Sequence, residues 1–98
     1  MSAMNAAERM AFATIRRLAR KDMIVIGEHA AVEMRADGVV YADVVNALLG
    51  AKACAGQPEE EKADWRVFGG VDHDDRSLVC CVNITDEATL VVVVTVYR

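Results

Sequence analysis

The C-terminal segment constrains the fold of this chain most strongly. Residues 90–97 read Leu-Val-Val-Val-Val-Thr-Val-Tyr, a run of mainly β-branched residues that favours a strand. Because side chains alternate between the two faces of a strand, this segment is apolar on both faces. Such a strand is either central in its sheet or covered by another element. We therefore expect residues 90–96 to be flanked by the short extended segment 23–26, or to be buried against a second copy or a partner protein.

The front half of the chain has the spacing of amphipathic helices. Apolar residues recur every three to four positions over residues 4–20, 28–37 and 42–49, which predicts three helices. Gly38 ends the second helix, because glycine readily adopts the left-handed conformation that lets a chain leave a helix. Ser2 is a candidate cap for the start of the first helix.

The back half of the chain reads as strands. The strand candidates are Trp65–Gly69, Ser77–Ile84 and Ala88–Tyr97, and the short polar connectors between them predict an antiparallel meander. Residues 51–64 show no regular pattern and include the polar loop Gln57–Lys62. The sequence therefore predicts an α+β fold in a single domain over residues 1–98, with three N-terminal helices packed on one face of a small antiparallel sheet.

Composition and motifs exclude several classes of protein. No apolar run approaches the roughly 20 residues of a membrane helix, and no signal-peptide core is visible, so we expect a cytoplasmic protein with no membrane partner. The three cysteines and two histidines show no metal-ligand spacing, which favours reduced, structural thiols. The chain also lacks a Gly-rich phosphate loop, a Cys-x-x-Cys pair and a nucleophile elbow. These observations argue against a metal hydrolase or a dehydrogenase, and for chemistry that needs no cofactor.

Charge is distributed unevenly along the chain. The net charge is −4, yet residues 9–21 contain five basic residues and no acid, whereas residues 59–75 contain seven acids and two bases. This dipolar layout suits a homodimer or a charged partner. Arg9, Arg16 and Arg20 share the helix face opposite the apolar stripe. They form either a solvated helix surface or a strip that binds the phosphates of RNA.

One pattern resembles a known family. The pattern His29-Ala30-x-x-x-Met34-x-x-x-Gly38-Val39, followed by Asp43-Val44-x-x-Ala47-Leu48, resembles the signature His-Ala-x-x-Arg-Met-x-x-Arg-Gly-Ile of a widespread family of small bacterial proteins. That family is thought to be related to the RelE-like toxins of toxin–antitoxin systems. Over about residues 12–98, the chain also resembles the motility quorum-sensing regulator (MqsR-type) toxins in the order of its elements. The chain carries Glu33 and Asp37 where the signature has arginine.

The resemblance implies a RelE-like fold and the toxin of a type II toxin–antitoxin pair, with a cognate antitoxin protein as its partner. The implied activity is metal-independent cleavage of mRNA by attack of a 2′-hydroxyl, which needs a base, an acid and cations around the transition state. The positions that match the family's catalytic residues are His29, Arg66, Arg76, Tyr97 and Arg98. The rival interpretation is a catalytically silent interaction module on the same fold, which binds a partner or antitoxin through its sheet edge or acidic loop.

Each candidate residue also has a purely structural interpretation. His29 can be a capping or core-edge histidine, and Tyr97-Arg98 can be a frayed terminus. Trp65 is expected to pack on the sheet rather than to stack on bases. His73 lies among three aspartates in a turn and is expected to be solvated.

Overall fold

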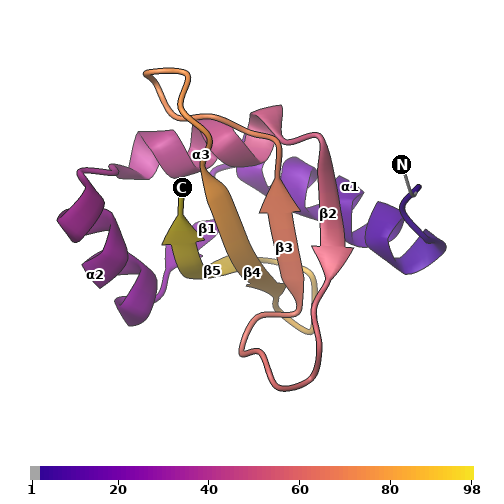
Figure 1. Cartoon of the computed structure of the whole chain (residues 1–98). Coiled ribbons are helices and arrows are strands. Elements are labelled where there is room, and N and C mark those ends of the chain that lie inside the picture. The colour runs from indigo at the N-terminus through magenta and orange to yellow at the C-terminus, as the bar shows by residue number, and fades with distance from the viewer. Residues whose placement is uncertain (1–2) are drawn as a thin grey trace.

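Five strands form one sheet in the computed structural model, which describes residues 3–98 and so leaves the candidate cap Ser2 outside the described residues. The strand order is β1-β5-β4-β3-β2 (Figure 1). The strands are β1 (Ile24–Ile26), β2 (Ala53–Gly56), β3 (Trp65–Phe68), β4 (Val79–Ile84) and β5 (Val91–Tyr97). β1 runs parallel to β5, and the other neighbouring pairs are antiparallel, so the sheet is mixed.

Three helices form where the local sequence favours them. They are α1 (Ala6–Arg20), α2 (Glu28–Asp37) and α3 (Tyr41–Gly50). A capping box begins α1: the Asn5 side chain accepts from the Glu8 amide at 2.8 Å, and the Glu8 carboxylate accepts from the Asn5 amide at 2.9 Å. Gly38 ends α2 with a left-handed φ of 68°, as the sequence predicts.

The α+β class and the three helices are confirmed, but two details of the predicted architecture are wrong. The helices do not all precede the sheet, because β1 lies between α1 and α2. The sheet is not purely antiparallel, because β1 joins it parallel to β5. The sequence reading also missed β2, whose residues Ala-Cys-Ala-Gly have little intrinsic strand preference. Pairing with β3 orders this segment instead.

β5 is held along both of its edges, which confirms that residues 90–96 are flanked by the segment 23–26. The three residues of β1 pair with residues 91–93 on one edge, and β4 pairs along the other. After β1 the chain turns into α2, where the Glu33 carboxylate accepts the Val96 N–H at 3.0 Å. The backbone edge of β5 is thus covered first by a neighbouring strand and then by the Glu33 side chain. The contact with Glu33 fixes α2 beside β5.

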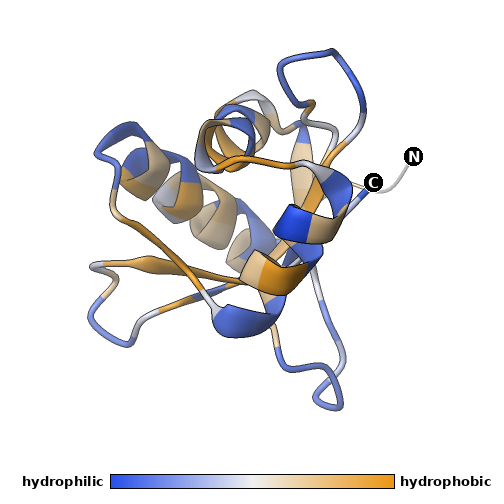
Figure 2. Ribbon diagram, turned by 90° about the vertical axis from the view of Figure 1, so that its left-hand side faces the viewer, coloured by the Kyte–Doolittle hydropathy of each residue, from blue (hydrophilic) through white to orange (hydrophobic). Residues whose placement is uncertain are grey.

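The core lies between the sheet and the two helices α1 and α3, which are drawn behind the strands in Figure 1. Apolar side chains of these helices, among them Ile15, Val44 and Leu48, are fully buried against valines of the sheet. In Figure 2 the strands are coloured as hydrophobic and the connecting loops as hydrophilic. The opposite face of the sheet, between α2 and the loop that joins β2 to β3, carries the candidate site described below.

A β-bulge in β5 shapes this open face of the sheet. Cys81 pairs with Thr95, whereas Val82 pairs with Val93, so Val94 is an extra residue opposite β4. In a regular strand, adjacent side chains point to opposite faces. The bulge instead lets the neighbours Val94 and Thr95 line the same surface.

A matched pair of glycine substitutions tests how the loop after β3 packs on α3. A Cβ atom at Gly70 would lie 2.0 Å from the Ala47 carbonyl oxygen, so Gly70→Ala should lower the free energy of unfolding by about 3 kcal/mol or more. At Gly50 a Cβ would meet no atom within 4 Å, and Gly50→Ala should be neutral or raise stability by about 0.4–1 kcal/mol. Urea unfolding of both variants measures the difference, and equal stabilities would contradict the packing described.

Candidate functional site

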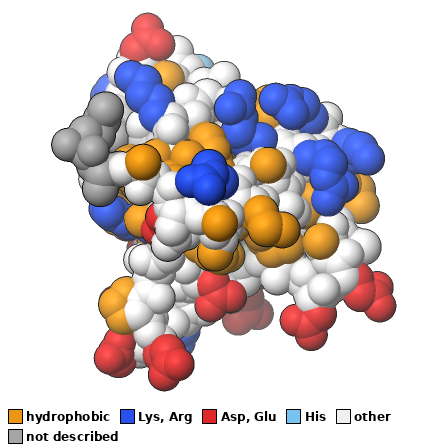
Figure 3. Space-filling model, turned by 90° about the vertical axis from the view of Figure 1, so that its right-hand side faces the viewer, with side chains coloured by type: hydrophobic (Ala, Val, Ile, Leu, Met, Phe, Trp, Pro, Cys, Tyr) orange, Lys and Arg blue, Asp and Glu red, His pale blue; other side chains and the backbone are white. Residues whose placement is uncertain are grey.

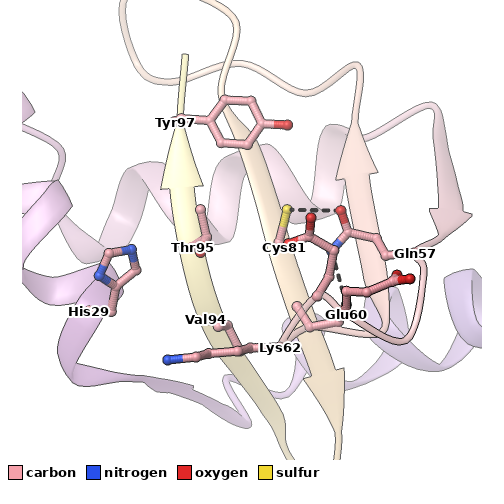
Figure 4. Close-up of a pocket in the computed structure, with 10 residues that line it drawn as sticks. His29, Gln57, Glu60, Lys62, Cys81, Val94, Thr95 and Tyr97 are labelled. Carbon is pink, nitrogen blue, oxygen red and sulfur yellow. Dashed lines mark hydrogen bonds between the residues drawn. The ribbon is translucent and has the colours of Figure 1, made fainter.

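The open face of the sheet carries a trough with a volume of about 560 Å³. Cys81, Val94 and Thr95 form its floor (Figure 4). His29 of α2 stands on one side of the floor, the loop between β2 and β3 on the other, and Tyr97 at the end of β5 closes the upper end. The trough therefore joins residues from both halves of the chain.

The loop that forms one wall of the trough is fixed to the sheet by backbone and amide contacts. The Gln57 amide donates to the Asp64 carbonyl at 2.8 Å, and the Gln57 side chain donates to the Ala63 carbonyl at 2.9 Å. Asn83 of β4 accepts the Asp64 N–H at 2.7 Å and donates to the Lys62 carbonyl at 3.0 Å. These contacts position the side chains of the loop over the sheet.

The trough brings together ionisable side chains of both signs. Glu60, Glu61 and Lys62 line it from the loop, and His29 and Tyr97 line it from the other elements. His29 Nε2 lies 3.4 Å from Glu33 Oε2, so an imidazolium at this position has a carboxylate beside it. In the sequence the three loop residues read only as part of a polar loop, because nothing local shows that a loop folds back over a sheet.

Arg66 lies on the same face of the sheet as the trough. It pairs with Cys81 across β3 and β4, and its guanidinium carbon lies 5.0 Å from the centre of the Phe68 ring. Burial raises the pKa of the Cys81 thiol, and the positive charge of Arg66 offsets only part of that effect. The thiol on the floor of the trough is therefore protonated near neutral pH and is not a nucleophile.

A second polar cluster surrounds Asp72, which is almost fully buried. Its carboxylate accepts from the Arg98 guanidinium and from the amides of Asp74 and Arg76, at 2.8 and 3.0 Å for the two amides. The Arg98 guanidinium, aided by these amides, lowers the pKa of Asp72 to about 2. Arg76 Nε lies 3.6 Å from the same carboxylate. Arg76 and Arg98 thus share one buried aspartate as their ion-pair partner.

Asp43 forms a third cluster at the start of α3. Its buried carboxylate accepts the Val40 amide at 3.0 Å and the His73 amide at 3.1 Å, and lies 2.6 Å from His73 Nδ1. The Val40 amide, together with His73, holds the pKa of Asp43 below its usual range. The ring of His73 is exposed, as expected of a solvated residue, and in addition one of its ring nitrogens is bound to Asp43.

The structure separates the predicted site residues into three groups. His29, Arg66 and Tyr97 lie on the open face of the sheet, whereas Arg76 and Arg98 meet at Asp72. The predicted RNA-binding residues Arg9, Arg16 and Arg20 line a separate depression on α1. Since α1 covers the other face of the sheet, a phosphate bound in the trough is separated from these three arginines by the sheet and the helix layer.

The described part of the chain, residues 3–98, contains no group of three or more histidine, cysteine or acidic side chains arranged to hold a metal ion. None of the helices in these residues is long and apolar enough to cross a membrane. Cys54, Cys80 and Cys81 are unpaired and buried.

The comparisons with known proteins place this chain in one family. The family described as "Domain of unknown function (DUF4258)" matches residues 26–98, so the chain belongs to it. The matched region contains the whole trough and the clusters around Asp72 and Asp43, and it excludes α1. No curated protein and no solved structure matches the chain.

The Asp43–His73 contact makes stability depend on pH. The hydrogen bond that His73 makes to the Asp43 carboxylate and the charge of this carboxylate raise the pKa of His73, whereas an unfolded histidine titrates near ~6.5. The resulting stabilisation is complete below about pH 6.5 and is lost as the pH rises through the raised pKa of the folded protein. Between about pH 6 and about pH 9, we expect the free energy of unfolding to fall more in the wild type than in His73→Gln. Urea titrations that show the same fall in both proteins would contradict this.

Proposed function

We propose that this member of the DUF4258 family is the toxin of a type II toxin–antitoxin pair and cleaves RNA in its trough without a metal. The observation that carries this proposal is the meeting of His29 and Tyr97, from α2 and from the end of β5, in one trough with two carboxylates and an ammonium group. The proposal includes the RelE-like fold and the cognate antitoxin that the sequence resemblance implies.

The residues of the trough suit transesterification by a ribose 2′-hydroxyl. Glu61 takes the proton of the 2′-hydroxyl, the 2′-oxygen forms a bond to phosphorus, and the bond from phosphorus to the 5′-oxygen breaks. His29, as an imidazolium, gives its proton to the leaving 5′-oxygen. The products are a 2′,3′-cyclic phosphate and a free 5′-hydroxyl, so atoms and charge balance. Glu61 is the proposed base because it lines the trough from the loop opposite His29.

Cations and a hydroxyl complete the proposed mechanism. Lys62 and Arg66 stabilise the charge that develops on the phosphate oxygens in the transition state. The Tyr97 hydroxyl points across the sheet above the floor of the trough, where it can donate to the same phosphate (Figure 4). Arg98, anchored on Asp72, holds the end of β5 in place, and Tyr97 pairs with Val79. This anchoring argues against the interpretation of Tyr97 and Arg98 as a frayed terminus.

The rival function is a catalytically silent interaction module on the same fold. The observation that favours it is the acidic wall of the trough, where Glu60 and Glu61 oppose the approach of a phosphate. Under the rival proposal the same trough or the acidic loop Glu59–Glu61 binds a basic segment of a partner protein. The two functions differ in their chemistry, since only the nuclease changes RNA.

Substitutions in the trough test the nuclease proposal. The purified protein should cleave single-stranded RNA in EDTA and leave 2′,3′-cyclic phosphate ends. His29→Gln should lower the rate about 10²–10⁴-fold because an amide cannot supply the proton. Arg66→Ala should lower it about 10²–10³-fold through loss of a cation at the transition state.

Expression of the wild type alone should arrest growth of a bacterial host, and Arg66→Ala should relieve the arrest.

His73→Gln is the matched control for these substitutions. It changes the other histidine, which lies outside the trough, so cleavage should stay within about threefold of the wild type while the protein stays folded. Normal growth with full expression of folded wild type, together with intact RNA in the cleavage assay, would contradict the nuclease and support the interaction module. Full cleavage by folded His29→Gln would remove His29 from the mechanism.

A further inference from the structure

α1 carries a second surface feature, a depression of about 300 Å³ on the helix layer. Three apolar and three basic side chains line it: Met4, Ala13, Phe12, Arg9, Arg16 and Arg20. All of them belong to α1 or to the residues just before it, and so precede the region that the family matches. The trough lies wholly within that region, whereas this surface lies wholly outside it.

The basic residues of this depression are not neutralised by the protein itself. Among residues 3–98, no carboxylate forms an ion pair with Arg9, Arg16 or Arg20. Arg9 donates to the Met4 carbonyl at 2.6 Å, which leaves its charge unbalanced. The Nε of Arg16 is buried and has no acceptor within the described residues. Because the guanidinium charges of the depression have no carboxylate partner in the described residues, this surface favours a ligand that brings anionic oxygens.

The surface around the depression combines charge with apolar contact area. Figure 3, which views the molecule from the side on which α1 begins, shows lysine and arginine side chains spread over the upper part of this face with hydrophobic side chains between them. Acidic side chains lie mostly toward its lower end, and red is also visible at the upper edge of the view. Met10 of α1 is 73% exposed, the largest exposure among the large hydrophobic residues described. A partner that fits this surface must carry both acidic and apolar groups.

From these observations we infer that the α1 depression docks an acidic amphipathic helix of a partner protein. Carboxylates of the partner pair with the guanidinium groups of Arg9, Arg16 and Arg20, since arginine binds a carboxylate through two parallel hydrogen bonds. Apolar side chains of the partner contact Met4, Phe12 and Ala13 between the arginines. The inference does not depend on the nuclease, because the depression and the trough lie on different layers.

RNA fits the same depression less well. Single-stranded nucleic acid binds strongly where a basic groove also offers aromatic faces on which bases stack. The aromatic ring in the depression is Phe12, and the Arg16 guanidinium already lies over it, 5.4 Å from the ring centre. The apolar lining of Met4 and Ala13 offers no hydrogen bond to a base edge. A protein segment with acidic and apolar side chains therefore fits both the basic and the apolar part of the depression.

A binding experiment with three probes tests this docking site on the full chain. The first probe is a fluorescein-labelled helical peptide of about 16 residues, with leucines on one face and glutamates on its flanks. The second is a scrambled peptide of the same composition, and the third is a labelled single-stranded RNA of about the same length. Fluorescence anisotropy should show that the amphipathic peptide binds at least about tenfold more tightly than either of the other probes.

Single substitutions on α1 assign the binding to the depression. Arg16→Ala and Arg20→Ala should each weaken binding of the amphipathic peptide about tenfold. Arg17→Ala, an exposed arginine of the same helix outside the depression, should change it less than about twofold. Arg16→Lys keeps the charge but not the paired donors, so its effect on peptide binding should lie between those of Arg16→Ala and Arg17→Ala. Thermal melts of all four variants should match the wild type.

Several results would overturn this inference. Equal binding of the scrambled peptide would show that the surface attracts acidic peptides by non-specific electrostatics alone. Preferred binding of the RNA, lost in Arg16→Ala and Arg20→Ala, would make it a nucleic-acid surface. A dimer in sedimentation experiments that both variants dissociate would make a second copy of the chain the occupant. A failure of the wild type to bind the amphipathic peptide, or an equal loss in Arg17→Ala, would also exclude the docking site.

Discussion

The placement of β5 between two partners is the constraint on which the rest of the structure depends. A strand of valines that is apolar on both faces cannot remain an open edge, and here β4 covers one edge while β1 and then Glu33 cover the other. Because β1 is short, the Glu33 carboxylate of α2 binds the edge of β5 beyond the end of β1. That contact sets α2 alongside the upper half of β5, and it brings His29 to the trough that Tyr97 closes.

Two buried aspartates organise the end of the sheet next to the trough. Asp72 ties the loop between β3 and β4 to the C-terminal Arg98, and Asp43 ties the same loop to the start of α3. Buried carboxylates persist only where they are paired and hydrogen-bonded, as both are here. Asp72 holds the last residues of β5, and with them Tyr97, in a fixed position, whereas Asp43 fixes the loop to α3. The nuclease proposal assigns the chemistry to the trough and the anchoring of Tyr97 to Asp72.

Local pattern was sufficient for much of the fold. The β-branched run predicted β5, and Gly38 marked the end of α2. The two apolar faces of β5 predicted either flanking by residues 23–26 or burial against another chain, and the structure shows the first. β2 was missed because Ala and Gly carry no strand signal and only the pairing with β3 orders them. Glu33 stands where the signature that the sequence resembles has arginine, so an acid replaces a base that could bind phosphate. The structure gives it a different role, since its carboxylate satisfies the Val96 amide 63 positions away.

The candidate site shows the same limit of sequence reasoning. His29 and Tyr97 were found through the family pattern, but the acids and lysine that join them come from a loop whose fold over the sheet depends on Asn83. His73 lies 30 positions from Asp43 and Arg98 lies 26 positions from Asp72, so local spacing could not reveal these two contacts. Arg76 and Arg98 were predicted as catalytic cations, and their pairing with the buried Asp72 became visible only in three dimensions.

Amide hydrogen exchange at Val96 tests most directly whether α2 is fixed to β5 as described. In the wild type, the Val96 amide should exchange as slowly as the Val91 amide, which donates to the Met23 carbonyl at 3.0 Å. Glu33→Ala should speed exchange at Val96 by about tenfold or more and leave Val91 nearly unchanged, whereas Glu33→Gln should retain most of the protection because its amide oxygen still accepts. Rapid exchange at Val96 in the wild type, or no change in Glu33→Ala, would contradict the account.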